Sequence, residues 1–268
     1  MIGENFVFRE KQNELSRLKE EFLALFKRQE DIFKENFVIY NRYNLLFGEK
    51  YFERYLLFCE GERLRRKIEL YQFYINRGEE IDKGFVEAVL NAEFREYEER
   101  LEKILEEYRA AQEFEKLPLL TKEEAREVKR IYLKIAKRIH PDLNSDFNEE
   151  MKELWLKTLN AYKLNDLETL QECEVLLDSF ILPSPPVAFE KLDAEIENFK
   201  KKIRKLQRKN RKLEKSFPYN QKELLTDSEW VNDKLEDLDR DIELLKKSLE
   251  FLKERLQEID PTYEKEIS

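Results

Sequence analysis

The sequence has 268 residues, of which 41% are charged and 41% hydrophobic, and its formal net charge is −9. It contains only 5 glycines and 7 prolines, a composition that is typical of long helices and coiled coils. The hydrophobic content excludes a disordered chain, and the negative net charge argues against a general nucleic-acid-binding protein.

Cysteine and histidine are too scarce and too scattered for a metal site. The chain has two cysteines, Cys59 and Cys173, and one histidine, His140, whereas a structural zinc site needs about four such ligands. We therefore expect no metal and no cofactor. The lack of a disulfide framework favours a cytoplasmic protein, and no apolar run approaches the ~20 residues that span a bilayer, so we expect no membrane partner.

Residues 1–116 contain no proline and predict a bundle of long helices. Gly48 is expected to end the first helix, Gly78 to cap the second in the left-handed conformation, and Asp82 to cap the third. Apolar residues recur at steps of three and four, so each helix has one apolar face. We interpret the many aromatic residues as core packing rather than as a binding groove. The first apolar stripe includes Leu15, Leu18, Phe22 and Leu25.

A separate domain is expected over residues 117–182, because Pro118 disfavours a helix before it. Thr121 and Glu124 have the spacing of a capping box, and the helix that follows must end near His140, since Pro141 cannot continue it. Its apolar face consists of Val128, Tyr132, Ile135 and Ile139. The outward side and its flanks carry Lys129, Arg130, Lys134, Lys137 and Arg138, with Leu133 among them.

Two further helices complete this domain. The first runs from about residue 147 to 163 and turns Met151, Leu154, Trp155 and Tyr162 inward, and the second covers about 167–180. The proline-rich segment 183–187 then predicts a semi-rigid linker.

Residues 188–268 show two heptad runs, at 192–217 and 231–259, each with a narrow apolar seam. Such seams pair in coiled coils, and the simplest arrangement is an antiparallel hairpin in which Asn210 helps to fix the register. The same heptads can also close between two chains, so a homodimer is possible.

The charges of the two heptad runs are opposite in sign. Residues 200–215 carry ten basic residues and one acid, whereas 227–243 carry eight acids and two bases. We expect the two stretches to neutralise each other across the hairpin. The alternative is that the basic stretch binds a polyanion, which would make binding fall steeply with salt. Nucleic acid is not the partner that we expect.

The central domain resembles a J-domain, the module of DnaJ/Hsp40-type co-chaperones, over about residues 114–180. The resemblance depends on His140-Pro141-Asp142 after a basic helix and on Asn144 after the turn. Further support comes from Tyr132 and Ile135-Ala136 before the turn, and from Trp155 and Asn160-Ala161-Tyr162 after it. Closer still is a group of bacterial J-domain proteins with helical flanks. The family's first helix would be supplied by about residues 108–117. Read as local structure alone, the tripeptide is a helix stop followed by a turn.

The resemblance implies a protein that binds Hsp70 and stimulates its ATPase, and that is not itself an enzyme. The basic helix would dock on an acidic surface of Hsp70, where complementary charge raises the encounter rate. The turn would then favour the hydrolysis-competent state of Hsp70. The implied Hsp70-binding residues are Lys129, Arg130, Leu133, Lys134, Lys137, Arg138, His140, Pro141, Asp142 and Asn144.

The predicted architecture is thus all-α, with an N-terminal long-helix bundle, a central J-like domain and a C-terminal antiparallel coiled-coil hairpin. The flanking helices are expected to bind an unknown client or adaptor protein or to self-associate. The alternative function is a structural adaptor whose J-like domain is inactive toward Hsp70.

Overall fold

The computed structural model describes residues 2–116, 120–144, 147–179 and 189–263, and within these ranges the protein is all-α, as predicted. The proline-rich segment 183–187 and the Leu117-Pro118 interruption both lie outside the described residues. No helix in the described ranges has the length and apolar character needed to cross a membrane. The helices are α1 (Ile2–Arg77), α2 (Lys83–Glu115), α3 (Lys122–Ile139), α4 (Glu149–Leu164), α5 (Leu167–Ser179), α6 (Phe189–Lys215) and α7 (Ser228–Ile259), with short 3₁₀ turns η1 (Tyr219–Gln221) and η2 (Leu224–Thr226).

The predicted helix stop at Gly48 is wrong, because α1 continues through it to Arg77. A glycine inside a helix costs only about 1 kcal/mol, which the buried apolar face of α1 outweighs. Gly48 instead makes room for Tyr108 of α2, whose ring would lie 2.8 Å from a Cβ at this position. The other local signals are confirmed: Gly78 has φ +68°, Asp82 accepts a hydrogen bond from the Phe85 N–H, and Thr121 with Glu124 forms a capping box.

The chain folds into two compact units, each assembled from segments that are distant in sequence. Unit 1 comprises Met1–Val38 and Pro118–Asn220, and unit 2 comprises Ile39–Leu117 and Gln221–Ser268. Helix α1 therefore contributes its first half to one unit and its second half to the other. Each unit therefore combines parts of more than one of the segments 1–116, 117–182 and 188–268, which we predicted as separate domains.

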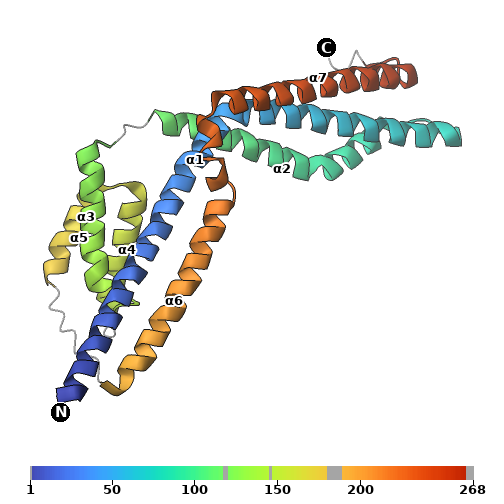
Figure 1. Ribbon diagram of the computed structural model, residues 1–268. Helices are drawn as coiled ribbons and strands as arrows, with labels where there is room; N and C mark the ends of the chain where they lie inside the picture. Colours follow the sequence, from blue (N-terminus) through green and yellow to red (C-terminus); the bar gives the residue numbers. More distant parts are fainter. Residues whose placement is uncertain (1, 117–119, 145–146, 180–188, 264–268) are drawn as a thin grey trace. The chain divides into compact units, whose positions relative to one another are not determined.

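In unit 1, α3, α4 and α5 pack on one another around a core that α1 also joins through Leu23 and Phe26. Figure 1 shows these three helices gathered beside the first half of α1, with α6 running along the same half. The seam of α6 closes on α1: Leu192, Ile196, Phe199, Ile203 and Leu206 form a buried cluster with Leu15 and Phe22.

Helix α6 runs parallel to α1, because the residue numbers of their contacts rise together. Asn210 lies on this seam, and its Nδ2 donates to the Leu25 carbonyl at 2.9 Å. Further polar contacts between the two helices join Lys11 with Asp193, Glu14 with Lys200, Glu21 with Gln207 and Arg28 with Glu214.

In unit 2, the second half of α1 packs antiparallel to α2 and parallel to α7. The shared core contains Leu64, Ile68 and Tyr71 of α1, Val86, Leu90 and Phe94 of α2, and Leu249, Leu252 and Leu256 of α7. The acids of α7 pair with cations of α1, as in Lys50–Asp239 at 2.6 Å and Arg54–Asp241 at 2.9 Å.

The seam of α6 thus closes on α1 rather than on the seam of α7, contrary to the expected antiparallel hairpin. The physical reason is that an apolar stripe fixes which face of a helix is buried but not which helix covers it. The predicted mutual neutralisation of 200–215 and 227–243 is likewise replaced by ion pairs to α1 and to Asp142. Within residues 200–215, eight exposed cations have no ion pair in the described structure: Lys201, Arg204, Lys205, Arg208, Lys209, Arg211, Lys212 and Lys215.

Candidate functional site

The His-Pro-Asp turn joins the C-terminal end of α3 to the loop before α4. His140 leaves the helix with φ −62° and ψ 130°, while its N–H still donates to the Ala136 carbonyl at 3.0 Å. Its carbonyl accepts from the Leu143 N–H at 2.9 Å and from Asn144 Nδ2 at 3.0 Å. These bonds fix the turn, and they give Asn144 a structural role in it.

The His140 imidazole is oriented by the turn itself. Its Nδ1 accepts a hydrogen bond from the Asp142 N–H at 3.0 Å, so Nδ1 carries no proton and the ring proton of the neutral form lies on Nε2. In the described structure Nε2 is buried and has no hydrogen-bond partner. A buried polar group left unsatisfied costs about 1–3 kcal/mol, and this cost offsets part of the stabilisation that burial of the ring provides.

Aromatic rings from two helices enclose His140, which is only 2% exposed. Phe22 and Phe26 of α1 lie with ring centroids 5.3 and 4.6 Å from the imidazole, and Trp155 of α4 lies at 5.0 Å. Burial lowers the pKa of His140 to about 4, with Lys202 lowering it further and Asp142 opposing the shift. The histidine is therefore neutral at physiological pH.

Asp142 and Leu143 are also held by residues from outside the predicted domain. Lys202 of α6 donates to Asp142 Oδ1 at 2.6 Å, and Leu143 packs both on the three-helix core and on the α1–α6 cluster. Pro141 remains exposed. Asp142 is exposed as well, with 41% of its side-chain surface open to solvent, so His140 is the one buried residue of the tripeptide.

The outward side of α3 is basic, although part of its charge is already paired. Arg130 and Lys134 both bind Glu174 of α5, at 3.1 and 3.0 Å. Lys129 and Lys137 are exposed and Arg138 is half-exposed. This face therefore presents a weaker positive field than its sequence indicates.

Leu133 does not stand outward as predicted, because it packs partly against the core. The buried arc of α3 is wider than its predicted stripe and also includes Ile131 and Ala136, since α4, α5 and α1 all contact the helix. Leu133 lies at the margin of that arc. The predicted core residues Val128, Tyr132, Ile135, Ile139, Trp155 and Tyr162 are all buried in the same cluster.

A buried polar cluster connects this core to α1. Tyr162 stacks on Tyr132 with ring centroids 4.0 Å apart, and its hydroxyl donates to Asp31 Oδ1. Lys34 Nζ lies 3.8 Å from the centroid of the Tyr162 ring, and burial lowers the pKa of Lys34 to about 8. The cluster shows that α1 is an integral wall of the three-helix core. Residues 108–115, which we expected as the family's first helix, belong to unit 2.

Sequence reasoning missed Phe22, Phe26 and Lys202 as residues of the site. Phe22 was recognised as an apolar stripe residue, and Lys202 as part of a basic stretch, but neither pattern names its partner. The available signal was the length of the apolar stripe of α1, which continues over both units and therefore needs more than one covering segment.

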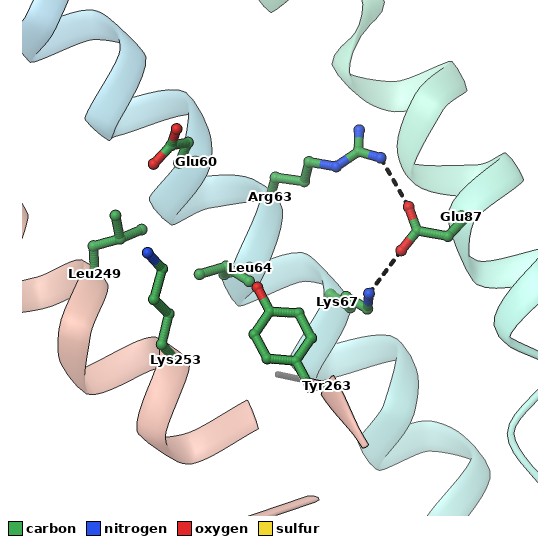
Figure 2. Close-up of a pocket in the computed structure, with 8 residues that line it drawn as sticks. All are labelled: Glu60, Arg63, Leu64, Lys67, Glu87, Leu249, Lys253 and Tyr263. Atoms are coloured by element: carbon green, nitrogen blue, oxygen red, sulfur yellow. Dashed lines mark hydrogen bonds and ion pairs between the residues drawn. The ribbon is translucent and has the colours of Figure 1, made fainter. Parts of the chain in front are cut away.

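Unit 2 contains a pocket of about 280 Å³ between α1, α2 and α7. Figure 2 shows Arg63 and Lys67 of α1 both directed at Glu87 of α2, at 2.9 and 2.7 Å. The cations are thus occupied by a carboxylate of the protein itself. The remaining lining residues are Glu60, Leu64, Leu249, Lys253 and Tyr263.

Comparisons of the chain with protein-family models, with curated proteins and with solved structures gave no match. Within the described ranges, no group of three or more histidine, cysteine, aspartate or glutamate side chains is placed to hold a metal ion.

Proposed function

We propose that the protein is an Hsp70 co-chaperone that acts through α3 and the His140-Pro141-Asp142 turn. The observation that carries the proposal is the local geometry: a helix with cations in its last turn ends one residue before a hydrogen-bonded His-Pro-Asp turn, and α4 and α5 pack back on it. This is the arrangement that the resemblance to a J-domain implies.

The action is one of binding, with the hydrolysis carried out by Hsp70. The outward cations of α3 attract an acidic surface and orient the encounter. The turn then binds one conformation of Hsp70 more tightly than the other, which shifts the population toward the hydrolysis-competent state. The helices of unit 2 and the outer face of α6 remain free to bind an adaptor, a client or a second copy of the chain.

The test is the steady-state ATPase rate of the Hsp70 from the same organism, measured with increasing amounts of the protein. We expect stimulation that His140→Gln abolishes and that Lys137→Glu weakens by raising the concentration needed. Glu153→Gln, on the exposed side of α4, is the matched control and should stimulate like the wild type. Equal stimulation by the His140 variant would contradict the proposal.

One observation favours the alternative of a structural adaptor, namely the burial of His140. If the J-like unit serves only as a helical layer, His140→Gln leaves the cellular role intact, whereas removal of residues 187–268 abolishes it. Comparing these two variants in cells distinguishes the adaptor from the co-chaperone.

A further inference from the structure

We propose that the chain masks its own His-Pro-Asp turn, and that α6 must move off the turn, so that the Phe22 and Phe26 side chains can turn away from His140 while α1 stays in place, before Hsp70 can bind. This inference rests on the proposed function and adds its regulation: the structure is the closed, autoinhibited state of the co-chaperone.

The mask contacts the two residues of the turn that carry polar side chains. Phe22 and Phe26 lie edge-on against His140, and Lys202 holds Asp142 at 2.6 Å. A partner that binds the His140 imidazole meets Phe22 and Phe26 in its place, and one that binds the exposed Asp142 carboxylate must compete with Lys202 for it. Closure and Hsp70 binding are therefore mutually exclusive.

Phe199 joins the two parts of the mask. The Phe199 ring makes an edge-on contact with Phe22, with 5.8 Å between the two ring centroids. On its other contact, Lys202 Nζ lies 5.2 Å from the centroid of the Phe199 ring. Displacing α6 removes Phe199 from Phe22 and Lys202 from Asp142 at once. The ring that covers His140 thus loses its support when α6 leaves.

The polar contacts of the closed state contribute little beside the apolar seam between α1 and α6. The Lys202–Asp142 pair is partly exposed, with 31% and 41% of the side-chain surfaces open to solvent, and such pairs contribute little. His140 Nε2 and Asn210 Oδ1 are both buried without a hydrogen-bond partner in the described structure. Opening allows water or a partner to satisfy both atoms.

The outer face of α6 is basic whether the mask is closed or open. It places cations four residues apart, as in Lys201–Lys205, Lys205–Lys209 and Arg208–Lys212, and like charges at this spacing destabilise a helix. Opening is expected as a local transition below the free energy of global unfolding. A ligand that binds α6 only when α6 is displaced from α1 would shift the equilibrium toward the open state.

The first measurement needs no Hsp70, because His140 is the only histidine of the chain. Diethylpyrocarbonate modifies an accessible neutral imidazole, and the absorbance of carbethoxyhistidine therefore reports on this one residue. In the full-length wild type we expect modification at least about tenfold slower than in the urea-unfolded chain, since only the open fraction reacts. His140→Gln gives the blank.

Lys202→Glu places a carboxylate against Asp142 and should raise the modification rate about fivefold, because like charges disfavour the closed state. Lys202→Met removes the ion pair without repulsion and should give a smaller increase. The matched control is Lys201→Glu, which makes the same charge change on the exposed outer face of the same helix and should leave the rate unchanged. Circular dichroism of each variant checks that the helices remain folded.

The second measurement is Hsp70 ATPase stimulation by the same four proteins. Stimulation that rises in Lys202→Glu and not in Lys201→Glu supports the mask. Wild-type His140 that reacts as fast as in the unfolded chain overturns it, as does an equal effect of the two glutamate variants. Faster modification in Lys202→Glu without stimulation by any variant supports the mask as a structural feature and overturns the proposed function instead.

Discussion

At the scale of single residues, the neutral imidazole of His140 couples stability to pH. The pKa of His140 is about 4 in the folded protein and about 6.5 in an unfolded chain, so the unfolded state binds the proton more tightly. Between these two values stability falls as the pH falls. The charged neighbours that contribute are Asp142 of the turn and Lys202 of α6.

We expect His140 to account for roughly 3 kcal/mol of lost stability in unit 1 between pH 7 and pH 4, from 1.36 kcal/mol per pKa unit. Urea unfolding at a series of pH values measures this loss. His140→Gln removes the ionisable group while the carboxylates stay unchanged, so the difference between the two curves isolates the histidine. Curves that remain parallel down to pH 4 would show that the imidazole is not buried.

Tyr162→Phe tests the polar cluster that attaches α1 to the three-helix core. The variant keeps the ring that stacks on Tyr132 and lies beneath Lys34, but it loses the hydrogen bond to the Asp31 carboxylate. Hydrogen bonds to charged groups contribute about 1.5–3 kcal/mol, and we expect a loss of that size in the free energy of unfolding of unit 1. The control is Tyr97→Phe in unit 2, a half-buried tyrosine for which no hydrogen bond is described, and it should change stability little.

At the scale of helices, Gly48 and Gly61 of α1 have opposite requirements. A Cβ at Gly48 would lie 2.8 Å from Tyr108 Cδ2, whereas a Cβ at Gly61 would have no atom within 4 Å. Alanine favours a helix over glycine by about 1 kcal/mol. The same substitution should therefore act in opposite directions at the two sites.

Gly61→Ala is expected to stabilise unit 2 by about 0.5–1 kcal/mol, and Gly48→Ala to destabilise it, because the Tyr108 ring must shift. Thermal unfolding followed by circular dichroism compares the two variants. The double variant Gly48→Ala/Tyr108→Ala provides the control: once the ring is absent, alanine at position 48 should no longer cost stability relative to Tyr108→Ala. Equal stabilisation at both positions would contradict a close approach of α2 at Gly48.

Signals that act within one or two turns of helix could be read from the sequence, because their energy comes from neighbouring residues. The Thr121–Glu124 capping box, the Asp82 cap and the left-handed Gly78 are of this kind. The buried faces of α3 and α6 followed from the 3.6-residue period. The helix stop at Gly48 failed because the packing of Tyr108, a residue sixty positions away, decides the role of that glycine.

At the scale of the whole molecule, unit 1 is discontinuous, and its three-helix core needs α1. Leu23 is buried with that core, and Phe26 packs against both His140 and Trp155. The site could be predicted from the sequence only in its continuous part, residues 121–162. Phe22, Phe26 and Lys202 reach it through pairing between distant segments, which no local pattern encodes.

The isolated fragment 118–179 should consequently fold poorly, since the side of its core that faces α1 is exposed to water. Burial of apolar side chains of this size contributes about 1.5–3 kcal/mol each. Thermal melting should be broad for the fragment, and cooperative after addition of a peptide covering residues 6–38. The control peptide carries Leu23→Asp and Phe26→Asp and should restore nothing. A fragment that melts cooperatively without the peptide would show that the three-helix core is stable without α1.

The parallel pairing of α6 and α7 with α1 also determines when the protein can fold during its synthesis. The ribosome makes α1 first, yet the segments that cover its apolar face in unit 1 end at residue 220, and those in unit 2 extend to the end of α7 at Ile259. The apolar face of α1 therefore remains partly uncovered while the later segments of the chain are still being translated. Exposed apolar surface on a nascent chain is what general chaperones bind, so this protein is expected to depend on general chaperones during its own synthesis.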